Sequence, residues 1–140
     1  MKAELILMGK TTDKLFATGI ADYADRITHY LSFSINTIPA LKNTKNLSEE
    51  EQKKAEGELI LRQLQPSDTV VLLDEHGAER TSMETAAWLQ KKMQTARRLV
   101  FVIGGPYGFS DAVYQRANEK ISLSRMTFSH QMVRLIFTEQ

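Results

Sequence analysis

The sequence contains no cysteine among its 140 residues. This absence excludes disulfides, zinc–thiolate sites and thiolate catalysis, and it is typical of a chain that works in a reducing compartment, so we expect a cytoplasmic protein. No stretch reaches the roughly 18 apolar residues of a membrane-spanning helix. The start, Met1 to Glu4, also lacks the basic and apolar segments of a signal peptide. We therefore expect no membrane partner and no cleaved leader.

An excess of charge of one sign is missing as well. Eighteen Lys and Arg residues stand against 17 Asp and Glu, which gives a formal net charge of +1. Composition therefore offers no electrostatic argument for a polyanionic partner. Two local groups of basic residues remain, but acids and glutamines interleave both, which favours solvated helix faces. These groups are Lys42, Lys45, Lys53 and Lys54, and Lys91, Lys92, Arg97 and Arg98.

Short apolar runs alternate with helical spacings along the whole chain, and no boundary of a second domain is visible. Ser48 with Glu51, and Thr81 with Glu84, form capping-box signatures that open two of the helices. The pattern predicts one α/β domain over residues 1–140, with a mainly parallel sheet and helices on both faces. Strands are expected at 3–8, 32–38, 69–73, 99–103 and 121–124, and helices at about 13–30, 48–65, 81–93, 110–120 and from 129 onward.

The last helix differs from the others because apolar residues surround most of its circumference. Such a helix must be buried nearly all round, and in so small a chain a second copy is the simplest cover. The sequence therefore predicts a twofold homodimer. The residues concerned are Met132, Val133, Leu135, Ile136 and Phe137.

Two segments follow the central apolar runs, at the edge where open α/β sheets place their ligands. They are residues 72–77 and 103–108, and both contain glycine, which lets a backbone approach a ligand closely. A glycine cluster alone is more simply a turn. No Gly-x-Gly-x-x-Gly or Gly-Lys-Ser/Thr motif is present, which disfavours dinucleotide and triphosphate sites. Asp74 and Glu75 are suited to hold a ribose or act as a base, although solvated turn residues are more common there.

Other chemistries find little support. His29, His76 and His130 are far apart in sequence and lack metal-ligand spacing, so we assign no metal. No Gly-x-Ser-x-Gly motif marks a hydrolase nucleophile. A hydroxyl-rich segment, residues 122–129, leads into a helix on which His130 and Arg134 share a face at i and i+4. For that pair alone, a functional and a merely structural role are about equally supported.

Taken together, these segments closely resemble the RlmH family of ribosomal RNA pseudouridine N3-methyltransferases, which belongs to the SPOUT superfamily. The resemblance covers nearly the whole chain. Its most specific parts are Leu73 to Gly77, Phe101 to Gly108, and Ser122 to Thr127 with His130, Gln131 and Arg134.

The resemblance implies a carboxyl-terminal trefoil knot, against the general rule that chains do not thread loops. It also implies that S-adenosyl-L-methionine binds in the knot and that a homodimer completes each active site. By position in the family motifs, the cofactor-binding residues would be Leu72, Leu73, Gly104, Gly105, Leu123, Ser124, Arg125, Met126, Thr127 and Phe128.

The implied reaction is methylation of N3 of a pseudouridine in large-subunit (23S) rRNA, on the assembled ribosome. His130 would orient or deprotonate the base, and Arg134 would bind phosphate or stabilise charge on the uracil oxygens. Members of the family continue beyond Gln140 with a Leu-Tyr-Arg-Ala segment and a tail ending in Pro-Tyr-His. We therefore expect this sequence to lack part of the substrate side. Two alternatives stay open: a SPOUT enzyme for another rRNA or tRNA base, and a non-catalytic ribosome-binding module.

Overall fold

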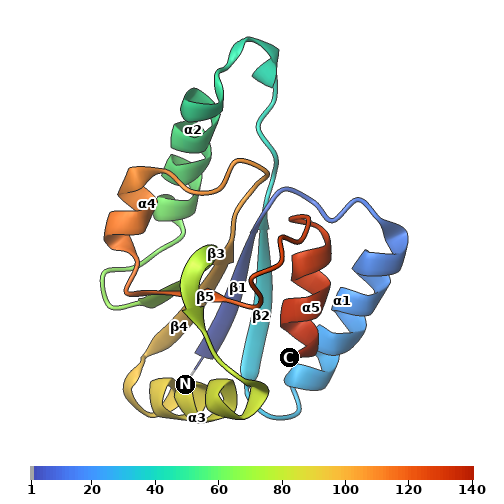
Figure 1. Cartoon of the computed structure of the whole chain (residues 1–140), viewed down its shortest axis with the longest axis vertical. Helices are drawn as coiled ribbons and strands as arrows, with labels where there is room; N and C mark the ends of the chain where they lie inside the picture. The colour runs from blue at the N-terminus through green and yellow to red at the C-terminus, as the bar shows by residue number, and fades with distance from the viewer. Residues whose placement is uncertain (1) are drawn as a thin grey trace.

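Five parallel strands form one sheet in the order β2-β1-β4-β3-β5 (Figure 1). The computed structural model describes residues 2–140. The strands end at their carboxyl side along one edge, as in other parallel α/β sheets. Their bounds are β1 Lys2–Met8, β2 Ser32–Ile38, β3 Thr69–Glu79, β4 Arg98–Ile103 and β5 Glu119–Ser122.

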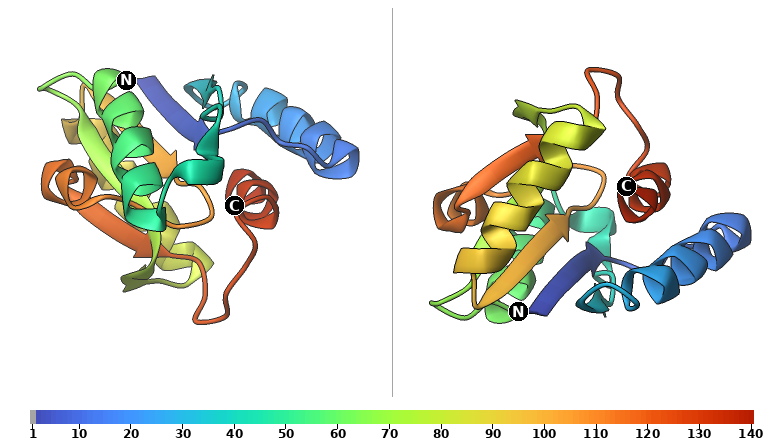
Figure 2. Two further views of the ribbon diagram at one scale, coloured as in Figure 1. Left: turned by 90° about the horizontal axis from the view of Figure 1, so that it is seen from above. Right: turned by 90° about the horizontal axis from the view of Figure 1, so that it is seen from below.

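Helices cover both faces of the sheet, as the sequence predicts (Figure 2). Helices α2 and α4 pack on one face, α3 and α5 on the other, and α1 packs against α5. No helix within residues 2–140 is long and apolar enough to cross a membrane. The helix bounds are α1 Lys14–Ile27, α2 Glu49–Arg62, α3 Ser82–Thr95, α4 Asp111–Arg116 and α5 Met132–Glu139, and the short 3-10 helix η1 covers Thr44–Asn46.

The expected capping residues begin their helices. Ser48 and Glu51 exchange side-chain and backbone hydrogen bonds at the start of α2, and Thr81 and Glu84 do the same for α3. Each capping box satisfies two backbone donors that a helix cannot pair internally. Both predicted helix starts are confirmed.

Strand β3 is longer than the apolar run predicts. It pairs with Ile121 of β5 first through Leu73 and then again through Ala78, so residues 74–77 form a wide bulge inside the strand. A Cβ on Gly77 would lie 2.5 Å from the carbonyl carbon of Ile121, so only glycine permits this contact. The expectation that residues 74–77 follow the end of the strand is therefore wrong.

After β5, the chain returns across the carboxyl edge of the sheet to the side that carries β1 and β2 (Figure 1). Residues 123–131 make this return, and α5 then packs beside α1. A Cβ on Gly19 would lie 2.7 Å from a methyl group of Leu135, so glycine allows the two helices to lie this close. The return carries the segment 123–131 over the ends of the central strands.

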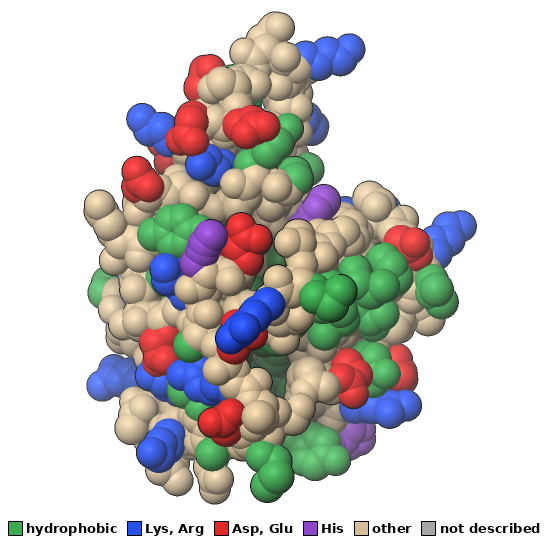
Figure 3. Space-filling view, in the orientation of Figure 1, with side chains coloured by type: hydrophobic (Ala, Val, Ile, Leu, Met, Phe, Trp, Pro, Cys, Tyr) green, Lys and Arg blue, Asp and Glu red, His purple; other side chains and the backbone are tan. Residues whose placement is uncertain are grey.

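Helix α5 is not buried all round within one protomer. Its fully buried side chains are the polar Arg134 and Thr138, whereas its apolar residues are only half-buried. Val133 and Phe137 pack against the core of the sheet. What we call the apolar strip consists of the exposed Leu15 of α1 with Met132, Leu135 and Ile136 of α5, and apolar side chains are visible over these two helices (Figure 3).

Candidate functional site

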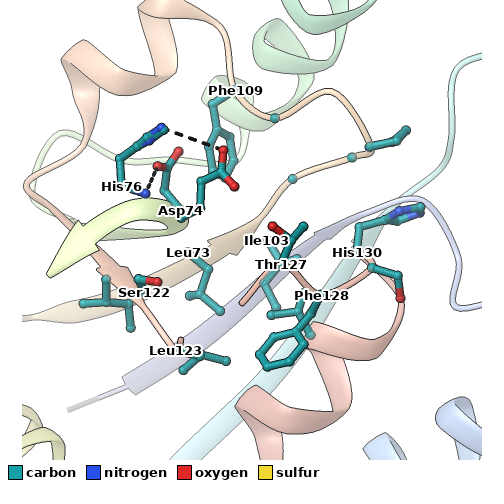
Figure 4. Close-up of a pocket in the computed structure, with 18 of the residues that line it drawn as sticks. Leu73, Asp74, His76, Ile103, Phe109, Ser122, Leu123, Thr127, Phe128 and His130 are labelled. Carbon is teal, nitrogen blue, oxygen red and sulfur yellow. Dashed lines mark hydrogen bonds and ion pairs between the residues drawn. The ribbon is translucent and has the colours of Figure 1, made fainter. Parts of the chain in front are cut away.

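A cavity of about 600 Å³ lies beside the bulge of β3 and the carboxyl end of β4 (Figure 4). Its walls come from the three segments that the sequence motifs single out, namely residues 73–76, 103–109 and 121–130. These segments are far apart in the chain and meet only because the return after β5 crosses this edge. The volume is within the range of small-molecule sites.

One wall of the cavity is a tight turn that contains three glycines, Gly104, Gly105 and Gly108. The N–H of Gly108 donates to the carbonyl of Gly105 at 3.2 Å, and Gly108 has a φ of +83°, which glycine adopts without strain. Gly104 packs against the ring of Phe109, where a Cβ would lie 3.0 Å from Cε1. At its glycines the turn therefore presents backbone, without side chains, to the cavity.

Acidic groups lie at a second wall, in the β3 bulge. Asp74 accepts a hydrogen bond from the backbone N–H of His76 at 2.8 Å, and the hydroxyl of Tyr114 donates to its other oxygen. Burial, and then the Asp74 hydrogen bond, raise the pKa of Tyr114, so its hydroxyl stays protonated. Glu75 lies 3.7 Å from the imidazole of His76. This wall places two carboxylates beside the cavity.

The third wall is the segment of the return, which is ordered by its own hydroxyl groups. Ser122 donates to the carbonyl of Ser124 at 2.8 Å, and the hydroxyl of Ser124 accepts from the N–H of Met126 at 3.0 Å. Ser129 then accepts from the N–H of Met132 at 3.1 Å at the start of α5. These local bonds explain why a loop with so many serines holds a defined shape.

His130 lines the cavity and is half-buried. Burial, and then the positive charge of Arg134, lower the pKa of His130 below its ordinary value. The imidazole is therefore mainly neutral at pH 7 and able to accept a proton. Figure 4 shows His130 across the cavity from His76.

Arg134 does not line the cavity, although it lies one helical turn after His130. Its side chain is 0% exposed and donates to the carbonyls of Met8 and Gly9, at 2.8 and 2.9 Å, and to the hydroxyl of Thr11 at 2.9 Å. The expectation of a direct contact with phosphate or uracil oxygens finds no support in this geometry. The guanidinium instead fastens α5 to the end of β1.

Most of the expected cofactor-binding residues meet at the cavity, and two do not. Leu72 is fully buried in the core beneath α2 and α4, and Arg125 is largely exposed and pairs with Glu79 at 3.1 Å. The expected residues that line the cavity are Leu73, Gly104, Gly105, Leu123, Ser124, Met126, Thr127 and Phe128.

Tyr114 also lines the cavity, and sequence reasoning missed it. It lies on the short helix α4 and reaches Asp74 across 40 residues of chain, so no local spacing marks it. No cluster of metal-ligating side chains is found within residues 2–140.

The chain is similar to known proteins over its full length. The sequence profile of the family described as "Predicted SPOUT methyltransferase" matches residues 1–140. Proteins named ribosomal RNA large subunit methyltransferase H are 60% identical in Phocaeicola vulgatus, 61% in Parabacteroides distasonis and 58% in Bacteroides fragilis. Each match covers 100% of this chain and 90% of the relative. The similarity therefore includes every segment that lines the cavity.

Proposed function

The chain belongs to the SPOUT methyltransferase family, and from this premise we propose that it methylates N3 of a pseudouridine in large-subunit rRNA, using S-adenosyl-L-methionine. The cavity carries this proposal, because it is built from the same three segments on which the family resemblance rests. Family membership also implies that the return after β5 threads the chain into a trefoil knot. The similarity to relatives named for ribosomal RNA supports the class of substrate.

The cavity fits the proposed methyl donor in size and in chemistry. Leu73, Leu123 and Phe128 give it apolar walls, and the Gly105 turn offers backbone polar groups. Asp74 and Glu75 lie beside it, and carboxylates favour a ligand that carries positive charge. When bound, S-adenosyl-L-methionine supplies an electrophilic methyl group on its sulfonium. We assign its binding to Leu73, Gly104, Gly105, Leu123, Ser124, Met126, Thr127 and Phe128.

We assign His130 to the substrate base. Methylation at N3 would require that the N3 proton leave. The neutral imidazole of His130, half-buried at the cavity, is suited to orient N3–H and to take this proton. Holding the base against the cavity lowers the activation barrier further, because an aligned near-attack geometry removes much of that barrier.

Arg134 is assigned a positioning role in place of the direct contact that the sequence suggests. By bonding to Met8 and Gly9, it fixes the first turn of α5, which follows directly on His130. Its charge also lowers the pKa of His130. Arg134 therefore acts on the reaction through His130 rather than through the RNA.

A second copy of the chain is proposed as the cover of the apolar strip. The strip lies on α1 and α5, next to the cavity-lining residues His130 and Val133, so a partner seated there adjoins the site. This agrees with the homodimer that the composition of α5 predicts. We further propose that the dimer acts in the cytoplasm on the assembled ribosome, since a net charge of +1 gives weak affinity for RNA alone.

Two measurements on the same preparation test the proposal. Calorimetric titration with S-adenosyl-L-methionine measures binding, and incubation with ribosomes that lack the modification, followed by mass spectrometry of rRNA fragments, measures transfer. Binding with an added methyl on a pseudouridine is expected, and His130→Ala should slow transfer while cofactor affinity is kept. Transfer to a tRNA or to another rRNA base would contradict the stated substrate. Binding without transfer would contradict the proposed catalysis. Failure of a folded protein to bind the cofactor would overturn the proposal entirely.

A further inference from the structure

A buried carboxyl lies behind the cavity and belongs to none of the motifs. Glu56, in the middle of α2, is 6% exposed, and its Oε1 has no hydrogen-bond partner among residues 2–140. Its other oxygen lies 3.5 Å from the amide nitrogen of Gln52. Burial raises the pKa of Glu56. A buried carboxyl with an unpaired oxygen lowers stability at a helix–sheet interface that apolar residues fill elsewhere. Its presence there is therefore best explained by a function.

Glu56 packs directly on the backbone of the glycine turn. A Cβ on Gly105 would lie 3.0 Å from Oε1 and 3.1 Å from Oε2 of Glu56, closer than side chains normally approach. Gly105 has no positive φ that would require glycine, and the atoms nearest to a Cβ there all belong to the carboxyl of Glu56, which a larger residue would displace. Gly105 therefore lies between Glu56 on one side and the cavity on the other.

The next residue of α2 makes a second close approach. A Cβ on Gly57 would lie 2.3 Å from the hydroxyl of Ser110, the residue that caps α4. Two successive residues of α2 thus contact both ends of the segment 105–110, which forms one wall of the cavity between them. Helix α2 is the support against which this wall rests.

We propose that Glu56 is a positioning residue for cofactor binding: its carboxyl supports the Gly104–Gly108 turn and accepts a hydrogen bond from the backbone of that turn when the methyl donor is bound. The free Oε1 is the acceptor, since it has no partner in the described residues and lies against Gly105 of this turn. This inference rests on the proposed function of the cavity. Glu56 itself does not line the cavity and touches neither the cofactor nor the RNA.

Two substitutions by side chains of similar length distinguish a positioning role of Glu56 from a packing role. Glu56→Gln keeps an oxygen acceptor, and Glu56→Met fills the same space without one. We expect Glu56→Gln to bind S-adenosyl-L-methionine within about threefold of the unmodified protein. Glu56→Met should bind about tenfold more weakly, because misplaced binding groups have effects of that order. Its melting temperature should nevertheless not fall, because an apolar side chain replaces a buried polar one.

Calorimetric titration and thermal unfolding of the full chain measure both quantities. Glu58→Gln and Glu58→Met are matched controls, since Glu58 is on the same helix but exposed, and neither change should alter affinity. Equal affinity of Glu56→Met and the unmodified protein would overturn the inference while leaving the methyl-donor site intact. If Glu56→Gln loses as much affinity for the cofactor as Glu56→Met does, the role assigned to Oε1 is overturned. If the unmodified protein binds no cofactor, the proposed function fails first and the inference with it.

Discussion

Replacing Arg134 by alanine should destabilise the protein strongly, because this side chain is buried where the first turn of α5 meets the end of β1. The side chain is 0% exposed and is the partner of two backbone carbonyls, those of Met8 and Gly9. Each buried acceptor left without a partner costs about 1–3 kcal/mol, so the two together cost about 2–6 kcal/mol. The unpartnered Nε offsets part of this, because removing it relieves the cost of its own burial. A loss of about 3 kcal/mol is a large share of the roughly 5–15 kcal/mol of a typical domain.

Urea unfolding followed by circular dichroism measures this effect. With a slope of about 1–3 kcal/mol per molar urea, a loss of about 3 kcal/mol in Arg134→Ala should lower the unfolding midpoint by about 1–3 M. The control is Arg125→Ala, whose side chain is 91% exposed and forms one ion pair, with Glu79. Exposed pairs contribute about 0–1 kcal/mol, so this control should change the midpoint little. Equal midpoints for the two variants would refute the reasoning that Arg134 fastens α5 to β1.

Three further predictions concern the site and its surroundings. Because the pKa of His130 is lowered, the rate of transfer should stay constant from pH 8 to pH 7 and fall only below the ordinary histidine pKa of about 6.5. Stability should also fall below that pH, since the unfolded chain binds the proton more readily than the folded chain. Single-turnover rates measured across this pH range check the prediction: the pH dependence should disappear in His130→Gln, and a dependence that this variant leaves unchanged would contradict it. Tyr114→Phe removes the hydroxyl that donates to Asp74 and should weaken cofactor binding by about two- to tenfold with little change in melting temperature, whereas Tyr23→Phe on α1 should change neither. Leu15→Glu, in the apolar strip, should shift sedimentation toward a monomer, and Met83→Glu, equally exposed but on α3, should not; identical sedimentation of both variants would argue against the proposed interface.

Local signals in the sequence predict most of the architecture. The apolar runs of β1, β2 and β4 and the capping residues of α2 and α3 are short-range features, and the structure confirms each of them. Strand β3 could not be bounded in this way, because its extension past Leu73 depends on pairing with Ile121 across the sheet. Helix α4 ends at Arg116, before the predicted end near residue 120, because β5 already begins at Glu119.

The candidate site, like the fold, is predicted where local sequence signals suffice and missed where long-range contacts decide. Motifs predict the segments that form the cavity, since glycines and hydroxyl residues at strand ends are visible in the sequence. They do not predict which side chains turn inward. The sequence predicts that Arg134 shares a helical face with His130, but α5 begins only at Met132, after His130. The partners of Arg134 lie 125 and 126 residues away, and those contacts take it out of the cavity. Glu56 carries no sequence signal, because its burial is set by the approach of Gly105 from a distant loop.

The contacts between α5 and the end of β1 also determine the order in which the chain can fold during synthesis. Gln131 bonds to Thr12, and Arg134 to Gly9, so a strand that leaves the ribosome early is completed by residues translated more than a hundred positions later. Closing loops of this length is slow, and contacts of this range raise the contact order of the domain. The carbonyls of Met8 and Gly9 gain these partners only once α5 has been translated, and the cavity cannot close before segment 123–131 has been made.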